Sequence, residues 1–214
     1  TQHASMLVNA SRFTGIQNLI RNRLHEHLKI IEDAVRVYGA SPSANTNPEI
    51  ASLKRVWQDE YSEAYPHWAE ILENLLPVVA SASVIAVNSS SPTTLDYDAV
   101  GENGLTLIAV GGFSLSRGLT LEGLTVSYFL RNSMMYDTLM QMGRWFGYKD
   151  GYVDLCRIYT SGTLISWYKH IALADRELRM EFVKMFAAKK TPFEYGLKVR
   201  SHPQGLRITA LSKM

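Results

Sequence analysis

The sequence predicts an α/β protein with an open, mostly parallel sheet. Short apolar runs that end in small or polar residues alternate with longer segments whose apolar residues recur every three or four positions. This alternation is typical of parallel strands joined by crossover helices, and such sheets bind ligands at the carboxyl ends of their strands. The runs at 5–11, 83–88, 105–110, 125–131 and 153–160 are the expected strands.

The first strand is expected at 5–11, and a helix follows it. Thr14 and Gln17 have the spacing of a capping box, and Gly39 is a natural helix end. The polar segment 40–48 predicts an exposed loop, and the apolar spacing of 49–76 predicts a second helical region. Pro66 is expected to divide that region, because proline inside a helix removes a hydrogen bond and clashes with the preceding turn.

The second half of the chain continues the alternation. After the strands at 83–88 and 105–110, the glycine-rich segment 111–123 leads into the strand at 125–131. Helices are expected at 136–147 and 164–188, on either side of the last strand. The C-terminal segment shows mixed patterning and carries no assignment.

Composition restricts the class of protein. The chain has 214 residues, enough for one sizeable domain with an insertion, and its 46% hydrophobic and 20% charged residues are ordinary for a globular protein. A single cysteine excludes an intramolecular disulfide and any site built from several cysteines. No apolar run approaches the roughly 20 residues of a membrane span, and the N-terminus lacks a signal-peptide pattern. A soluble, cytoplasmic protein without membrane association is therefore expected.

The net charge of +2 conceals an asymmetry. Residues 1–100 carry a formal charge of −4 and residues 101–214 carry +6. From Lys184 onward there are seven lysines and arginines and one acid, Glu194. A basic segment of this kind can follow a phosphate backbone, and it can equally be a solvated surface that packs on a partner.

Two segments carry the candidate chemistry. In 111–120, GGFSLSRGLT, two glycines leave a strand and are followed by serines and an arginine, which can bind an oxyanion, although the segment is not a Walker A loop. On the helix expected at 135–148, polar residues at intervals of four, three and four form one stripe: Asp137, Gln141, Arg144 and Tyr148. That stripe places Arg144 as a cation directed at a phosphate, while the alternative is a surface ion pair with Asp137.

The segments 111–131 and 136–160 resemble the Z1 domain family of candidate endonucleases and ATP-dependent DNA-acting proteins, and 5–18 resembles the start of the same domain. That family in turn resembles the C-terminal lobe of superfamily-two helicases. The resemblance implies one domain over residues 1–214 with a RecA-like (P-loop NTPase-type) three-layer sandwich. It also implies a helical insertion at about 40–80 and a basic C-terminal segment from about 184.

The resemblance also implies roles for individual residues. Ser116, Arg117 and Gly118 are similar to helicase motif V, which links the nucleotide site to the nucleic-acid groove. Gln141, Gly143 and Arg144 are similar to motif VI, whose arginine reaches the γ-phosphate and stabilises charge on the transferred phosphoryl group. The full expected set is Arg144 as the catalytic residue, Gly118, Thr120, Gln141 and Lys149 at the nucleotide, and Ser114, Ser116 and Arg117 at the nucleic acid.

The sequence departs from the helicase pattern at several positions. Motif V has an acid where this chain has Thr120, motif VI has a second arginine where this chain has Gly147, and its leading glutamine falls where Met140 stands. The Walker A lysine and Walker B acid of the first lobe are not found. We therefore expect ATP and Mg²⁺ only in a full-length protein, bound mainly by an N-terminal ATPase lobe, with no cofactor or metal held tightly here and no ATP hydrolysis by this chain alone.

The expected partners are DNA or another nucleic acid and that N-terminal lobe. The function that the resemblance implies is the C-terminal lobe of an ATP-dependent nucleic-acid translocase or remodeller. Two other functions remain open: a nucleic-acid-binding or protein-interaction module without catalysis, and a nuclease domain. No nuclease motif supports the second, since the candidate acids lack a strand pattern. His25 and His27 are unsuited to one metal on a helix, Cys156 is expected as a buried small residue, and Trp57, Trp68 and Trp167 are expected in the core.

Overall fold

The computed structural model describes residues 3–88, 97, 104–112, 121–130, 139–140 and 151–195, and the chain divides into two compact units. The first unit comprises 1–129 and 145–159, and the second comprises 130–144 and 160–214. The elements of the described residues, in chain order, are β1 (Ala4–Asn9), α1 (Thr14–Tyr38), η1 (Ala44–Thr46), α2 (Pro48–Glu60), α3 (Trp68–Ser81), β2 (Ser83–Val87), β3 (Thr106–Gly111), β4 (Leu124–Phe129), η4 (Val153–Leu155), β5 (Arg157–Thr160), α5 (Gly162–Ala187) and α6 (Pro192–Tyr195).

The five strands form one sheet in the order β2-β3-β1-β4-β5. Strand β1 pairs in parallel with both β3 and β4, and β2 pairs in parallel with β3. The α/β class with a parallel sheet, expected from the alternating pattern, is thus confirmed. Parallel strands need crossover connections, and here α1 to α3 form the crossover from β1 to β2.

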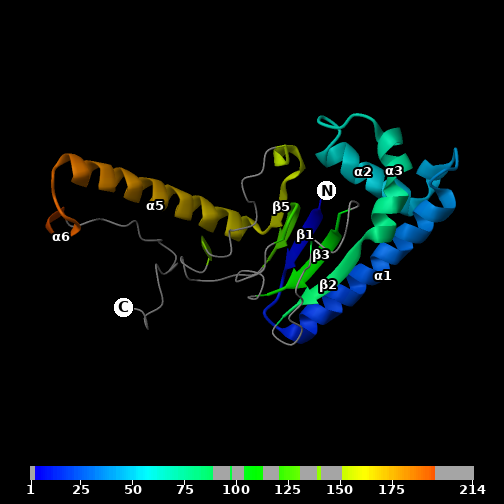
Figure 1. Cartoon of the computed structure of the whole chain (residues 1–214), viewed down its shortest axis with the longest axis horizontal. Helices are drawn as coiled ribbons and strands as arrows, with labels where there is room; N and C mark the ends of the chain where they lie inside the picture. Colours follow the sequence, from blue (N-terminus) through cyan, green and yellow to red (C-terminus); the bar gives the residue numbers. More distant parts are fainter. Residues whose placement is uncertain are drawn as a thin grey trace. The chain divides into compact units, whose positions relative to one another are not determined.

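Helix α1 covers one face of the sheet and lies along β2 in Figure 1. Val8, Val84 and Val110 form the buried cluster of that face, and α1 packs on it through Ile20 and Leu24. A second cluster forms from β2 and β3 around Leu107 and Ala109. The apolar spacing that predicts α1 is therefore the spacing of residues that pack on the strands.

The segment expected as a helical insertion has a hydrophobic core of its own. Val35 of α1, Ala44, Ile50 of α2 and Val79 of α3 are buried together there. The indole rings of Trp57 and Trp68 lie 5.6 Å apart at its border. The helical region is interrupted between α2 and α3 at Tyr61–His67, so the division expected at Pro66 is confirmed.

Four local expectations are wrong. Thr14 is the first residue of α1 and not its cap, because Phe13 occupies the N-cap position and makes no side-chain cap bond. Helix α3 continues to Ser81 through Pro77, where the sequence predicts an end at 76. The strand expected at 153–160 is shorter, because 153–155 form a 3₁₀ turn and only Arg157–Thr160 are extended. Cys156, expected as a buried residue, lies between the two and is only partly buried. Its thiol donates to the Tyr152 carbonyl at 3.2 Å.

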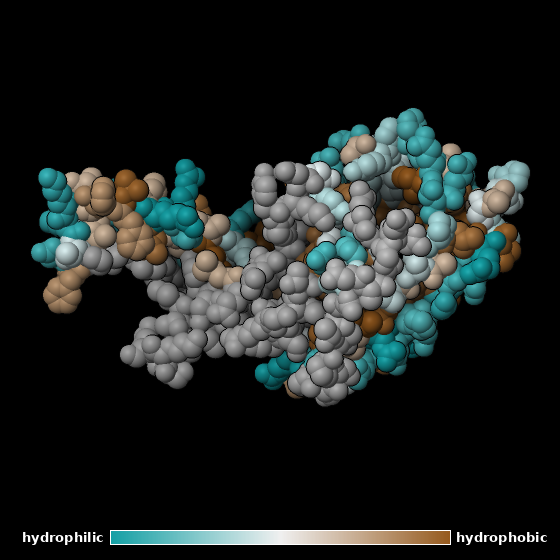
Figure 2. All heavy atoms as spheres, viewed as in Figure 1, coloured by the Kyte–Doolittle hydropathy of each residue, from teal (hydrophilic) through white to brown (hydrophobic). Residues whose placement is uncertain are grey.

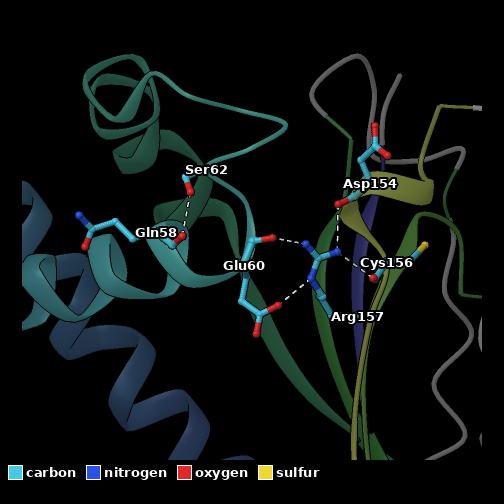
Figure 3. A network of polar contacts seen from close by, with 6 residues as sticks. All are labelled: Gln58, Glu60, Ser62, Asp154, Cys156 and Arg157. Atoms are coloured by element: carbon cyan, nitrogen blue, oxygen red, sulfur yellow. Dashed lines mark hydrogen bonds and ion pairs between the residues drawn. The ribbon is translucent and has the colours of Figure 1, made fainter.

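A polar network joins the insertion to β5 (Figure 3). Arg157 Nε donates to Glu60 Oε2 at 2.8 Å, and the guanidinium also donates to the Glu60 carbonyl at the end of α2. Its Nη1 reaches the carbonyls of Asp154 and Cys156, both at 3.0 Å, and its carbon centre lies 4.5 Å from the Tyr61 ring centre. The bond to Glu60 raises the pKa of Arg157. A cation at the C-terminus of α2 also complements the helix dipole.

The second unit contains the long helix α5, whose start is capped by Ser161 through the Leu164 amide at 3.3 Å. Leu164, Ile171 and Ala174 are its buried residues. Tyr168 donates to the Leu139 carbonyl at 2.9 Å, and burial raises its pKa. Among the helices of the described residues, none is long and apolar enough to cross a membrane.

We predict that Arg157→Lys lowers the unfolding temperature of the first unit by several degrees. Lysine keeps the charge but cannot bond the Glu60 carboxylate and the main-chain carbonyls together, because it lacks the planar fork of arginine. The matched control is Arg179→Lys, whose 2.8 Å bond to Asp175 lies within an exposed pair on α5 and should leave the transition unchanged. Equal small effects of both substitutions, measured by thermal unfolding, would contradict the assignment.

Candidate functional site at the carboxyl edge of the sheet

The carboxyl ends of four strands meet at one edge of the first unit. In register, Asn9 at the end of β1 lies opposite Phe129 at the end of β4, and Val87 of β2 lies opposite Gly111 of β3. The loop from β1 into α1 begins at this edge. The glycine-rich segment also follows directly on β3 in the sequence, so the edge expected to hold a ligand is where the candidate motifs begin.

Two amide side chains are buried at this edge. Asn9 is 2% exposed and Gln17, in the first turn of α1, is 3% exposed. Gln17 Nε2 donates to the Ser11 carbonyl at 3.0 Å. Within the part of the chain that the structure describes, the side-chain oxygens of Asn9 and Gln17 are buried acceptors without a hydrogen-bond partner. Buried acceptors are ordinarily paired, so each oxygen is suited to accept a bond from a donor group.

Gly112 permits this packing. A Cβ on Gly112 would lie 2.7 Å from Gln17 Nε2 and 3.1 Å from the Ser11 carbonyl oxygen. The sequence predicts that glycines after β3 allow a ligand to approach the backbone. At Gly112 the space is instead occupied by the protein's own loop, which any side chain would displace. The glycine therefore fixes the β1–α1 loop against the end of β3.

The β1–α1 loop also presents a cation. Arg12 is exposed, and its guanidinium carbon lies 4.8 Å from the centre of the Phe13 ring. The Phe13 amide donates to Ser11 Oγ at 3.1 Å, which shapes the entry into α1. The first turn of α1 contains no acidic residue. An exposed guanidinium beside the amides of a helix start is an arrangement that favours an anion such as a phosphate.

All the predicted site residues lie outside the described residues: Arg144, Gly118, Thr120, Gln141, Lys149, Ser114, Ser116 and Arg117. On the helix expected at 136–147, the described residues are Leu139 and Met140. Both are helical, and Leu139 is fully buried.

Sequence reasoning missed the residues that the structure brings together at this edge, namely Asn9, Ser11, Arg12 and Gln17. The available signal was a polar residue that closes a buried apolar run, followed by an arginine in the turn before a helix. The three-residue spacing of Thr14 and Gln17 suggested helix capping, whereas the amide of Gln17 turns back toward Ser11.

A second polar cluster lies at the amino edge of the sheet. His3 Nδ1 accepts from the Leu105 amide at 3.1 Å, and His3 Nε2 lies 3.8 Å from Glu122 Oε2. The Tyr97 ring meets the His3 ring edge-on at 4.9 Å, and burial raises the pKa of Tyr97. These contacts tie the start of β1 to the segments before β3 and β4, which is a structural role.

His25 and His27 are exposed on α1. Among the described residues, no three acidic, histidine or cysteine side chains are grouped closely enough to hold a metal ion.

We predict that Gly112→Ala costs about 1–3 kcal/mol of unfolding free energy, because the new methyl group overlaps Gln17 and Ser11. In a Gln17→Ala background the same substitution should cost at least about 0.5 kcal/mol less, since one of the two overlapping groups is gone. Urea unfolding of the four proteins in this cycle measures the coupling. Strictly additive costs would show that the two residues do not pack together.

Comparisons with known proteins identify the family. Searches of curated proteins and of solved structures found no match. The family model of the Z1 domain matches residues 1–206, nearly the whole chain. Because the family model covers this much of the chain, the chain belongs to the Z1 domain family.

Proposed function

We propose that this chain is the C-terminal, RecA-like lobe of an ATP-dependent nucleic-acid translocase or remodeller that acts in the cytoplasm. Membership of the Z1 family and the parallel sheet support this proposal. The RecA-like assignment rests on the strand arrangement together with the similarity of 111–131 and 136–160 to helicase motifs V and VI.

The observation that carries the proposal is the convergence of strand ends. Strands β1, β3 and β4 are parallel neighbours, so their carboxyl ends lie at one edge. Arg12 follows β1, the motif V segment follows β3, and the motif VI segment follows β4 in the sequence. Parallel sheets bind phosphate-bearing ligands at this edge, and the segments that carry the candidate residues follow, in the sequence, the strands that end there.

In this proposal Arg144 acts as the arginine finger. A guanidinium at the γ-phosphate stabilises the negative charge that develops as the phosphoryl group is transferred. Gly118, Thr120, Gln141 and Lys149 would lie along the nucleotide, whose phosphates and Mg²⁺ are held mainly by an N-terminal ATPase lobe. Ser114, Ser116 and Arg117 would contact the nucleic acid, and we add to that group Arg12, which is exposed in the loop after β1.

Two departures from the helicase pattern favour a second function, that of a nucleic-acid-binding or protein-interaction module without ATPase activity. Gly147 stands where a second motif VI arginine is usual, and Thr120 stands where motif V has an acid. Such a module would bind nucleic acid with strong salt dependence and show no response to ATP.

We predict that Arg144→Ala in the full-length protein reduces nucleic-acid-stimulated ATP hydrolysis about a thousandfold, because arginine fingers contribute on that scale. Arg144→Lys should not restore the rate, since lysine lacks the bidentate geometry. The control is Arg23→Ala, which removes an exposed arginine of α1 paired with Glu26 at 3.2 Å. Undiminished hydrolysis by Arg144→Ala would remove this residue from the site.

We also predict that Arg12→Ala weakens nucleic-acid binding and lowers the slope of log affinity against log salt by about 0.7 to 0.9, the loss of one phosphate contact. Fluorescence anisotropy with labelled oligonucleotides at several salt concentrations measures both quantities. Arg23→Ala again serves as the control. An unchanged slope for Arg12→Ala would mean that the β1–α1 loop does not touch the backbone.

A further inference from the structure

The turn between α5 and α6 exposes two aromatic rings. Phe186 in the last turn of α5 is 85% exposed, and Phe193 of α6 is 99% exposed. Figure 2 shows apolar side chains beside hydrophilic ones at this end of α5. The two rings lie seven positions apart in the sequence, and exposed apolar side chains that gather on one segment mark a binding surface. We call Phe186, Lys189, Lys190 and Phe193 the aromatic–basic turn.

The backbone of this turn is well defined. The Lys189 amide donates to the Phe186 carbonyl at 3.0 Å, and the Lys190 amide donates to the Met185 carbonyl at 3.2 Å. These two bonds form a Schellman motif, in which the residue after the helix adopts the left-handed conformation. Here that residue is Lys189, with φ of 52°. Glycine is the usual residue at this position, because a side chain disfavours the left-handed conformation. In this chain the position is occupied by a lysine.

The next element is capped through an acid. The Thr191 amide and hydroxyl both donate to Glu194 Oε2, each at 2.9 Å. These bonds lower the pKa of Glu194. The turn and the short helix α6 are therefore held in place by local hydrogen bonds, and Phe193 is carried on this ordered segment.

Charge around the turn is positive. Lys184 pairs with Glu181 at 2.8 Å, whereas neither Lys189 nor Lys190 takes part in an ion pair within the described part of the chain. From Lys184 to Tyr195, the described end of the chain carries three lysines and one acid, Glu194, whose carboxylate accepts bonds from Thr191 and keeps its negative charge. The charge therefore complements a polyanion.

We propose that the aromatic–basic turn binds single-stranded nucleic acid, with bases stacked on Phe186 and Phe193 and phosphates neutralised by Lys189 and Lys190. Exposed rings interleaved with cations are the means by which proteins bind single strands without sequence preference. The proposal rests on the proposed nucleic-acid function and adds a contact surface on the second unit, which neither the motif resemblance nor the carboxyl edge includes.

A membrane surface fits the turn less well. A helix that lies on a membrane collects its apolar residues in one stripe. On α5 the exposed apolar residues lie on one side of the helix, but exposed arginines lie among them: Val183 and Phe186 follow Arg179 at four and seven positions. The exposed side of this helix is thus mixed, without the continuous apolar stripe of a helix that lies on a membrane.

The test is anisotropy of a fluorescein-labelled oligothymidine of about twenty nucleotides with the 214-residue chain. Phe186→Leu with Phe193→Leu keeps the apolar volume but removes the rings, and we expect affinity to fall about 10- to 100-fold. Lys189→Gly should lower the salt slope by about 0.7 while the unfolding temperature stays the same or rises, because glycine suits the left-handed conformation. The matched control is Lys169→Gln, an exposed lysine earlier on α5.

Each outcome decides the proposal. Unchanged affinity of the double leucine variant, or a Lys189→Gly slope equal to that of the parent, overturns it. The proposal would also be overturned if the double leucine variant lost binding to vesicles of anionic phospholipid as strongly as it lost binding to oligothymidine, since that result identifies a membrane surface. If the double leucine variant loses oligothymidine binding and Arg12→Ala does not, the turn is supported and the carboxyl-edge contact is contradicted. If Arg12→Ala loses binding and the double leucine variant does not, only the carboxyl-edge contact is supported and the proposal for the turn is overturned.

Discussion

The parallel pairing of β1 between β3 and β4 is the constraint on which the rest of the first unit depends. Parallel neighbours run in one direction, so the ends of these strands, and the segments that follow them in sequence, begin at a common edge. The register is set by buried side chains such as Val8 and Val110. A slip by one residue would exchange the two faces of β1 and take Asn9 out of its buried position.

Packing at the carboxyl edge converts this pairing into a site. Gln17 returns from α1 to the Ser11 carbonyl, and Gly112 leaves room for both groups. Because these contacts connect the β1–α1 loop to the end of β3, Arg12 is presented from a fixed loop. In this packing the side-chain amide oxygens of Asn9 and Gln17 are buried and lack hydrogen-bond partners in the described region. Unsatisfied buried acceptors are tolerated mainly where they serve a function.

The segment expected as a helical insertion has a hydrophobic core of its own. This core, around Ile50 and Val79, is separate from the cluster under α1 that contains Val84. Arg157 ties the end of α2 to the beginning of β5 by bonding both the side chain and the main chain of Glu60. The pair therefore links two elements that are far apart in sequence.

Much of this fold follows from local patterns, and the failures have identifiable causes. A short apolar run predicted β1, and apolar residues at intervals of three and four predicted α1, because those residues pack on one another. Helix α3 continues past Pro77 since Val79 is buried in the insertion core, so tertiary packing outweighs the missing amide. The strand at 153–160 was predicted too long because its apolar run includes a 3₁₀ turn. At the site, the residues predicted from the sequence lie outside the described residues, and the approach of Gln17 to Gly112 joins residues from distant segments and has no local signature.

We propose that the carboxyl edge of the sheet binds nucleic acid, and hydrogen exchange of the 214-residue chain can test this with and without saturating single-stranded DNA. We expect slower exchange at the amides of 10–16 and 111–112, with no change at 122–124 near the amino edge. Protection confined to the amino edge, or no protection at either edge when the DNA is bound, would contradict it.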